Sequence, residues 1–514
     1  MMNRNRREFL ADVGRGMLIA SVGSALATDL GLSKAVAADT PDRLTFGNLE
    51  PLVSLMQETP ADKLLPIVVE KLKTGTELRT IVAAGALANA RTFGGHDYDG
   101  YHAFMALMPS YEMAKELPEE RRALPVLKVL HRNTRFIHNF GGAKKESLHP
   151  IEAAPLSKDE SREAPVRDAM RKADSAAAER ALAAFARQSD EKAYNQVLLA
   201  IQDDVDVHRT VLAWRSWATL ELTGREQALT LLRQSVRFCI DAEKSNIDRK
   251  RPVSGIRALL PKLLDQYRLV GKKPGSRKAD DPWMEKLCQA IYAGSRDQAA
   301  DAVAAALAEG MTTEDVGEAI SLAANRLVLR DPGRDRESAG KPVGSVHGAS
   351  VGVHASDAAN AWRNIARVST QRNSVASLIV AAYHTAGQAG QASRSPLPWA
   401  EHLAAVKGKD EKSLLAEMDE AIKARDQSRA SAVMQRYGEL GLPPRPAFEL
   451  LLRFAISEDG ALHAEKYYRT VSEEFTIARP AFKWRHLVAL ARVTASEYGF
   501  PAPGYADACQ LLKI

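Results

Sequence analysis

The stretch TELRTIVAAGALANA, residues 76–90, decides the fold class of this chain. Its apolar residues recur three and four positions apart, and it is rich in alanine, the strongest helix former. The same pattern returns at residues 176–186, 227–238, 298–308 and 413–437. Alternating runs of the kind that form strands are absent from the sequence. We therefore expect an all-α protein, built as an array of helical hairpins.

The positions of the non-helical stretches suggest that the chain has two halves. Glycine and proline clusters separate the helical stretches, and the segment GKKPGSRKADDP, residues 271–282, lies near the middle of the chain that follows the N-terminal segment. We predict an N-terminal helical half at 38–271, a linker at 272–281 and a C-terminal helical half at 282–514.

Histidines indicate that the two halves are an internal duplication. Eight of the twelve histidines form two series with the same order and nearly the same gaps, and Asn89 and Asn325 occupy matching positions before them, with an offset that increases along the chain because the loop that follows Asn325 is longer. The two series are His96, His102, His131 and His208 in the first half and His347, His354, His384 and His463 in the second.

Imidazole is the commonest metal ligand in proteins, and sites rich in it suit Zn, Cu, Fe or Ni. We therefore predict that all eight matched histidines are metal ligands in one or two sites between helices, with a transition metal (Fe, Cu or Zn) as cofactor. Asp97, Tyr98 and Asp357 lie close to these histidines in sequence, so they are the candidates to orient groups or to transfer protons. Asp97 has an alternative role as a helix N-cap.

Composition excludes several other classes of protein. The formal net charge of +6 is too small for a dedicated nucleic-acid binder. The three cysteines form no CxxC pair, and buried free thiols are expected in place of a disulfide scaffold. Trp214, Trp217, Trp362 and Trp484 are predicted to lie in the core. The sequence has no Walker glycine loop, HExxH motif, nucleophile elbow or EF-hand loop.

The N-terminus has the features of an export signal. Arg6-Arg7-Glu8-Phe9-Leu10 resembles the twin-arginine (Tat) motif, an apolar stretch follows at residues 16–32, and Ala35-Val36-Ala37 fits a cleavage site. We expect residues 1–37 to be a Tat signal peptide, read by the Tat translocon, and the mature protein to be periplasmic or otherwise extracytoplasmic. No later segment is apolar enough to predict a transmembrane helix. The Tat system moves folded proteins, often with a cofactor already loaded.

The mature region resembles two known families over short stretches. The paired histidines at 96–102 and 347–354, in an all-helical chain, are similar to questin oxidase-like proteins, which implies oxygen-inserting chemistry on polycyclic substrates. The stretch Gly310-Met311-Thr312-Thr313-Glu314 resembles a helix entry of carboxymuconolactone decarboxylase-like proteins, whose peroxidase members carry a CxxC pair that this chain lacks.

Three functions follow from these patterns. The first is an exported metal-dependent enzyme, an oxidoreductase that acts on a small-molecule substrate. The second is a HEAT-like helical repeat scaffold that binds a protein or a glycan. The third is a metal-free hydrolase or lyase that uses histidine as a base. A scaffold would scatter the eight histidines along its length, whereas an enzyme site would gather them.

Overall fold

The computed structural model describes residues 43–156, 164–338, 341–346, 350–392 and 395–514. The predicted signal peptide at 1–37 and the candidate ligand His347 lie outside these ranges. Within them the protein is built from helices, and only isolated bridges such as that of Arg277 with Met311 have strand-like pairing. The all-α prediction is confirmed.

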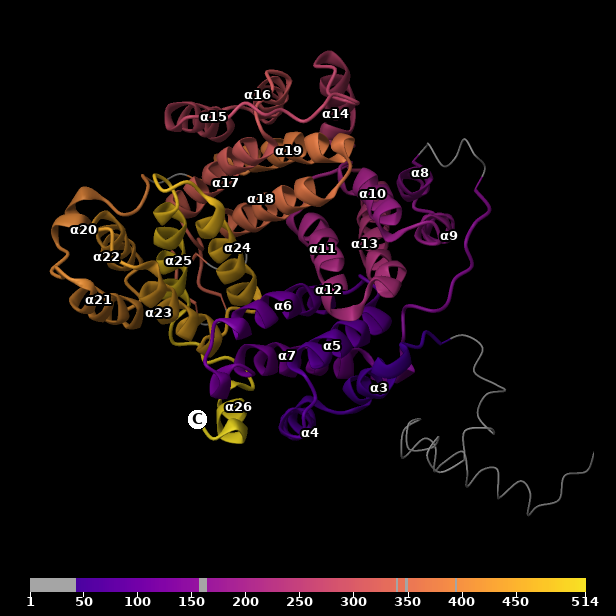
Figure 1. Cartoon of the computed structure of the whole chain (residues 1–514), viewed down its shortest axis with the longest axis horizontal. Helices are drawn as coiled ribbons and strands as arrows, with labels where there is room; N and C mark the ends of the chain where they lie inside the picture. The colour runs from indigo at the N-terminus through magenta and orange to yellow at the C-terminus, as the bar shows by residue number, and fades with distance from the viewer. Residues whose placement is uncertain (1–42, 157–163, 339–340, 347–349, 393–394) are drawn as a thin grey trace, which may run out of the picture.

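Four helices frame the centre of the molecule. In the view of Figure 1, α18 (Val351–Val368) forms the upper side of a quadrilateral, α6 (Tyr98–Lys115) the lower side, α24 (His463–Ile477) the left side and α11 (Val207–Ala218) the right side. Each of the four packs against its two neighbours around the quadrilateral. We call this arrangement the central frame. It combines two helices from each predicted half of the chain.

Further helices cover the outside of the frame. Most of those from the first predicted half lie below α6 or beside α11, and most of those from the second lie above α18 or beside α24; the exceptions are α14, which lies above α18 beside α16 and α19, and α26, which lies below α6 beside α4 and α7 (Figure 1). In the first half the covering helices are α3 (Glu50–Glu58), α4 (Ala61–Lys73), α5 (Leu78–Phe93), α7 (Leu124–Phe140), α8 (Pro165–Arg171), α9 (Ser175–Ala186), α10 (Asp190–Ile201), α12 (Leu220–Thr223), α13 (Ala228–Asp248) and α14 (Ile256–Gln266). In the second half they are α15 (Asp281–Ala293), α16 (Arg296–Ala308), α17 (Thr313–Arg330), α19 (Gln371–Ala386), α20 (Ala400–Ala404), α21 (Glu411–Lys423), α22 (Gln427–Glu439), α23 (Pro444–Ser457), α25 (Trp484–Glu497) and α26 (Tyr505–Leu512).

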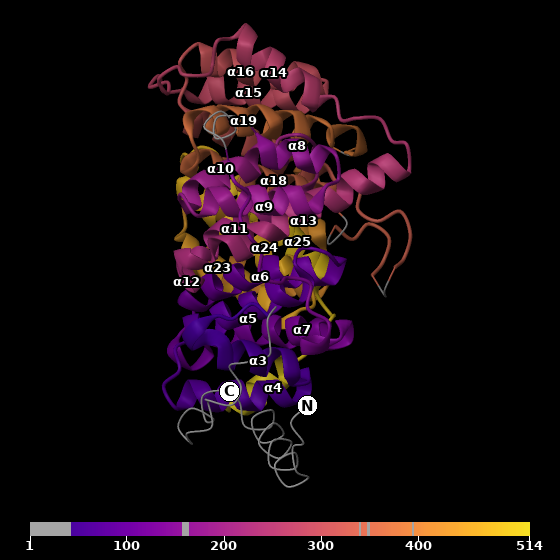
Figure 2. The same ribbon diagram turned by 90° about the vertical axis from the view of Figure 1, so that its right-hand side faces the viewer.

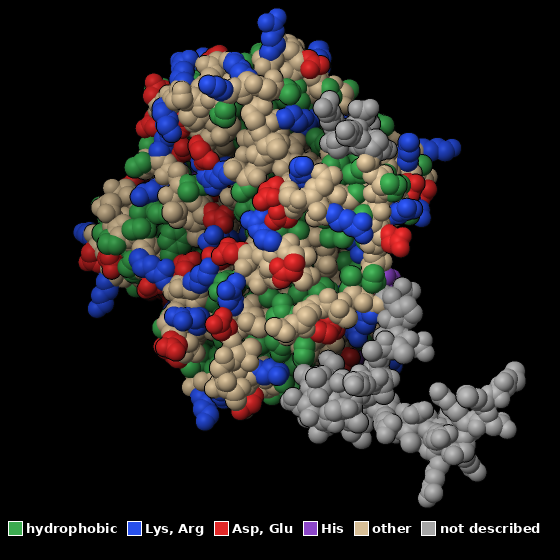
Figure 3. Space-filling view, turned by 45° about the vertical axis from the view of Figure 1, so that its right-hand side comes forward, with side chains coloured by type: hydrophobic (Ala, Val, Ile, Leu, Met, Phe, Trp, Pro, Cys, Tyr) green, Lys and Arg blue, Asp and Glu red, His purple; other side chains and the backbone are tan. Residues whose placement is uncertain are grey.

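The molecule seen from the side is a stack of helical layers. Figure 2 shows α14, α15 and α16 at one end, α3 and α4 at the other, and the frame between them. One hydrophobic core cluster runs through both predicted halves, from Phe46 to Ala508. No helix in the described ranges is long and apolar enough to cross a bilayer. On the face shown in Figure 3, acidic and basic side chains are interspersed.

Several helix predictions hold in detail, and one differs. The segment 76–90 lies within or next to α5, and the glycines that follow it, Gly94 and Gly95, have positive φ angles of 57° and 86° that end the helix. The predicted helical stretch 413–437 is instead two helices, α21 and α22. Arg425 between them has a φ of 56°, and the Asp426 side chain accepts a hydrogen bond from the Arg429 amide at 2.9 Å. This N-cap starts a new helix where apolar periodicity alone predicted a continuous one.

The predicted linker connects two helices, but the helix before it packs against the second half of the chain. Residues 272–281 do connect α14 to α15, but α14 packs against α16 and α19 of the second half. The division of the chain into two duplicated halves stays a prediction. All three cysteines are free, with Cys239 and Cys288 buried and Cys509 partly buried.

Candidate functional site

Four histidines meet inside the central frame, one from each of its helices. Their ring centroids form a closed circuit: 4.7 Å from His102 to His208, 5.6 Å from His208 to His354, 5.4 Å from His354 to His463 and 5.2 Å from His463 to His102. We call these four residues the histidine cluster. All four belong to the ligand set predicted from sequence. A scaffold with histidines dispersed along its length would not produce this arrangement.

Each clustered histidine stands in the first turns of its helix, and local capping fixes that start in α6 and α11. The Asp97 carboxylate accepts from the Gly100 amide at 2.9 Å and begins α6, so His102 lies just over one turn into that helix. The Asp206 carboxylate accepts from the Arg209 amide at 3.0 Å and begins α11, directly before His208. Such caps satisfy helix amides that have no partner within the helix.

The second half begins its helices in other ways. The Asp331 carboxylate, from the end of α17, accepts from the Gly352 amide at 3.0 Å and so satisfies the first turn of α18. Ala461 and Leu462, directly before α24, both have positive φ angles, 47° and 67°. Non-glycine residues rarely adopt this conformation, and such strain concentrates at functional sites. The turn places His463 as the first residue of α24.

Oxygen atoms fix the orientation of three of the clustered rings. Nδ1 of His102 donates to the Tyr98 carbonyl oxygen at 2.8 Å, and Nδ1 of His463 donates to the Ala461 carbonyl oxygen at 3.1 Å. Nδ1 of His208 lies 3.4 Å from an Asp206 carboxylate oxygen. Because these oxygens only accept, each neutral ring carries its proton on Nδ1 and presents an unprotonated Nε2.

Two of the four Nε2 atoms of the cluster have no hydrogen-bond partner within the described chain. Nε2 of His102 and Nε2 of His208 are buried and make no hydrogen bond within the described chain. Nε2 of His354 and Nε2 of His463 lie 3.3 Å apart. Two nitrogens bound to one tetrahedral metal ion at about 2.0–2.1 Å would also be about 3.3 Å apart. The cluster therefore has the donor type, the tautomers and one nitrogen separation that suit a transition-metal ion.

The side chains are not, however, drawn in around one point. Over residues 43–156, 164–338, 341–346, 350–392 and 395–514, no group of three or more His, Cys, Asp or Glu side chains is placed so that it could hold a metal ion.

Burial favours the neutral form of two clustered rings, His102 and His354. Burial is the main cause that lowers the pKa of His102 to about 2, and the nearby Lys466 and His208 lower it further. Burial, followed by His208 and Lys466, lowers the pKa of His354 to about 3. For Asp206 burial acts to raise the pKa, but the hydrogen bond and charge of His208 outweigh it and hold the pKa well below its usual range. Neutral imidazoles are the form that binds metal ions.

Two buried groups of opposite charge, Asp357 and Lys466, lie near the cluster. Asp357, one turn after His354, is buried and accepts from the Thr470 hydroxyl at 2.8 Å. Burial raises the pKa of Asp357 to about 6, although Lys466 opposes the shift. Burial lowers the pKa of Lys466 to about 8, although Asp357 opposes it. Both groups therefore titrate near neutral pH, which suits proton transfer.

Aromatic rings border the cluster on another side. The Tyr98 ring lies 4.1 Å from the His102 ring between centroids and is 58% exposed. The Tyr101 ring lies 5.1 Å from His102 and 5.5 Å from His208. Tyr98, a predicted site residue, thus stands between the cluster and solvent.

Three other predicted ligands, His96, His131 and His384, lie outside the cluster, and His347 lies outside the described residues. His96 uses both ring nitrogens elsewhere, with Nδ1 paired to Asp241 and Nε2 accepting from Arg237 at 2.9 Å. His131 lies on α7 beside Gly504 and lines a separate pocket. His384 is buried on α19 and within electrostatic range of His354 and Asp206, but it takes part in none of the ring contacts of the cluster. Asp97 is an exposed N-cap, as its alternative role predicted.

Sequence reasoning passed over several residues of the site. Asp206, Lys466 and Tyr101 were not among the candidates, although Asp206 lies two residues from a candidate ligand. A shared Gly-x-His pattern, Gly100-Tyr101-His102 and Gly352-Val353-His354, marks both helix starts and would have singled out His102 and His354.

Comparisons with known proteins add nothing to this description: no family model, curated protein or solved structure matches the chain.

Proposed function

We propose that the histidine cluster binds one transition-metal ion and that the protein is a metal-dependent oxidoreductase acting on a small molecule. The observation that carries the proposal is the convergence of four imidazoles, from four helices, with the Nε2 atoms of His102 and His208 buried and unpartnered within the described chain. An unpaired polar atom in the interior is costly, and a bound cation would satisfy several such atoms at once.

The residues divide into ligands and supporting groups. His102, His208, His354 and His463 would hold the ion through Nε2, while Asp206 and the carbonyls of Tyr98 and Ala461 orient three of the rings, as outer partners of metal-bound histidines do. A bound Fe or Cu ion would supply electron transfer to or from the substrate. Asp357 would hold or release a proton near neutral pH. The exposed Tyr98 would contact the substrate on the side of the cluster where its own ring faces solvent.

The metal content of the purified protein tests the proposal. We expect about one equivalent of Fe, Cu or Zn per chain by elemental analysis, because one four-histidine set holds one ion. Replacing both His354 and His463 by alanine removes two of the four ligands and should reduce the bound metal at least tenfold. His138→Ala, which removes an exposed histidine of α7, is the matched control and should retain the metal.

Titration of chelated protein with Co²⁺ provides a second measurement. Bound Co²⁺ in a tetrahedral nitrogen site gives visible absorption bands, which the double variant should lack. Native protein that contains no stoichiometric metal and gives no such bands would refute the metal-dependent function.

A second function is favoured by one specific observation. Asp357 and Lys466 are buried close together, and their pKa values of about 6 and about 8 lie on either side of neutrality. Groups shifted in this way are typical of acid–base catalysis. A metal-free hydrolase or lyase is therefore the alternative, and metal-free native protein would favour it.

The location of the protein is proposed on the sequence. Residues 1–37 are a Tat signal peptide in this proposal, and the mature protein acts in the periplasm or another extracytoplasmic space.

A further inference from the structure

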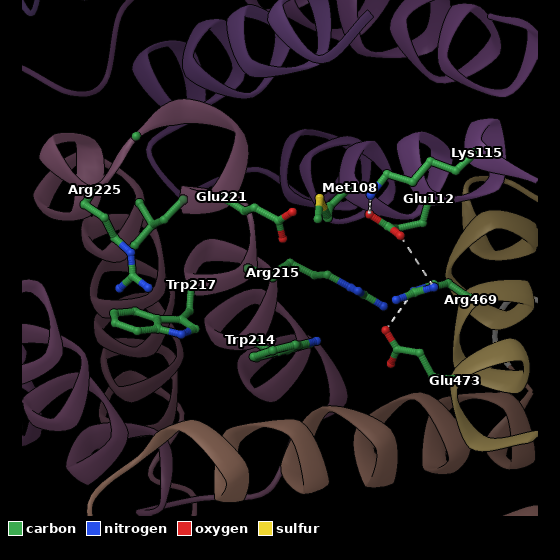
Figure 4. Close-up of a pocket in the computed structure, with 13 residues that line it drawn as sticks. Met108, Glu112, Lys115, Trp214, Arg215, Trp217, Glu221, Arg225, Arg469 and Glu473 are labelled. Carbon is green, nitrogen blue, oxygen red and sulfur yellow. Dashed lines mark hydrogen bonds and ion pairs between the residues drawn. The ribbon is translucent and has the colours of Figure 1, made fainter. Parts of the chain in front are cut away.

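A pocket of about 710 Å³ opens between α6, α11, α12 and α24. Figure 4 shows Arg215 and Arg469 pointing toward each other across it, with Trp214 beside them. Arg215 lies seven residues after His208 on α11, which places it about 10 Å along the helix axis from the histidine cluster. The pocket is therefore a separate cavity on the same helices.

Most charged groups of the pocket are already paired. Glu112 pairs with Lys115 at 2.7 Å and with Arg469 at 3.7 Å, and Arg469 also pairs with Glu473 at 2.7 Å. At the rim, Arg225 pairs with Asp190 at 2.6 Å, outside the pocket. These pairs neutralise Glu112 and Glu473, two of the three carboxylates that line the pocket.

Two charged groups of the pocket, Glu221 and Arg215, have no ion pair within the described chain, and of the two only Arg215 is buried. It is 3% exposed, and within the described chain no carboxylate lies at ion-pair distance from it and its Nε makes no hydrogen bond. Burial lowers the pKa of Arg215 and the neighbouring Arg469 adds to the lowering, although the carboxylates of Glu473, Asp357 and Glu112 oppose it. A buried charge with no partner is strongly unfavourable. Nε1 of Trp214, in the same pocket, is a second buried donor without an acceptor.

We infer that this pocket binds an organic anion, a carboxylate on an apolar or aromatic body. The carboxylate would accept from Arg215, whose planar guanidinium matches its two oxygens, and would lie between the two arginines that now face each other. Met108, Trp214, Trp217 and Leu220 line the apolar part of the pocket. The volume suits a ligand of drug-like size. The inference does not rest on the metal ion.

Isothermal titration calorimetry of the full chain tests the inference with two probes, 2-naphthoate and inorganic phosphate. We expect 2-naphthoate to bind more tightly than phosphate, because only naphthoate also fills the apolar part. Arg215→Gln should weaken naphthoate binding at least tenfold. Lys262→Gln, which removes one cation from the exposed surface of α14, should leave binding unchanged.

Thermal unfolding separates a binding role from a structural one. Because Arg215 is buried without a partner, Arg215→Gln should melt at the same temperature as the native protein or higher in the absence of anions. Naphthoate should raise the melting temperature of the native protein but not of the variant. The inference is overturned if naphthoate fails to bind the native protein, if phosphate binds equally well, or if Arg215→Gln binds naphthoate normally.

Discussion

In three of the clustered histidines, one neighbouring oxygen atom determines which ring nitrogen carries the proton. The Tyr98 carbonyl, the Ala461 carbonyl and the Asp206 carboxylate each accept from one Nδ1, so Nε2 is the unprotonated nitrogen of these three rings when they are neutral. Sequence showed which histidines belong to the set, but not these partners, because two of the three are backbone groups whose positions depend on turn conformation. The tautomers therefore became visible only with the fold.

The buried His102 makes the stability of the protein depend on pH. Its pKa is lowered from an ordinary value of about 6.5 to about 2, so the unfolded chain binds one more proton than the folded chain between these values. Stability is therefore full above pH ~6.5 and falls as the pH drops, by up to about 1.4 kcal/mol per pH unit for this residue. We expect His102→Gln to reduce that slope, measured by urea unfolding of chelated protein between about pH 4.5 and 7.

A control isolates the contribution of burial. His138→Gln removes a histidine that is exposed on α7, and it should leave the pH dependence as in the native protein. An identical slope in His102→Gln and the native protein would mean that His102 is not held neutral by the fold.

At the level of helices, the sequence predicted the positions of several helices but not the features that depend on local capping or on tertiary contacts. Apolar periodicity located α5, α9 and α16 because one face of each must be buried. It did not reveal the break between α21 and α22, which an N-cap and one left-handed residue produce. It also could not show that α6 meets α24 and α11 meets α18, because such pairings join residues hundreds of positions apart.

The helices α17 and α18 pack closely because residue 352, in the second Gly-x-His pattern, is a glycine. A Cβ at Gly352 would lie 2.5 Å from the Val328 Cα and 2.6 Å from the Val328 backbone nitrogen. Backbone atoms cannot rotate away, so Gly352→Ala must shift the start of α18. We expect a loss of about 1–3 kcal/mol of unfolding free energy, measured from the urea midpoint, together with weaker metal binding because His354 moves with the helix.

Gly390→Ala is the matched control for this substitution. An added Cβ there meets nothing within 4 Å, so the variant should keep the native urea midpoint. If Gly352→Ala and Gly390→Ala were equally stable, the close packing of α18 on α17 would not be required for the fold.

For the molecule as a whole, the histidine cluster needs almost the entire chain. Its four helices begin at Tyr98, Val207, Val351 and His463, so neither predicted half of the sequence contains the whole site. The sequence pointed to this result through matched histidines, yet it could not say whether they form one centre or two. It also assigned eight ligands where four converge, since a conserved order along the chain does not specify which side chains face inward.

The histidine cluster is assembled from distant segments of the chain, and this is consistent with the proposed export in folded form. A metal ion can enter the cluster only after residues up to α24 have folded, which suits a pathway that carries folded proteins across the membrane. In a bacterium with a Tat system, we expect Arg6→Lys combined with Arg7→Lys to leave the protein in the cytoplasm, folded and loaded with metal. Arg4→Lys, just outside the pair, should be exported normally. Fractionation followed by elemental analysis of each compartment measures both properties, and export of the double variant at the native level would contradict the Tat proposal without affecting the metal site.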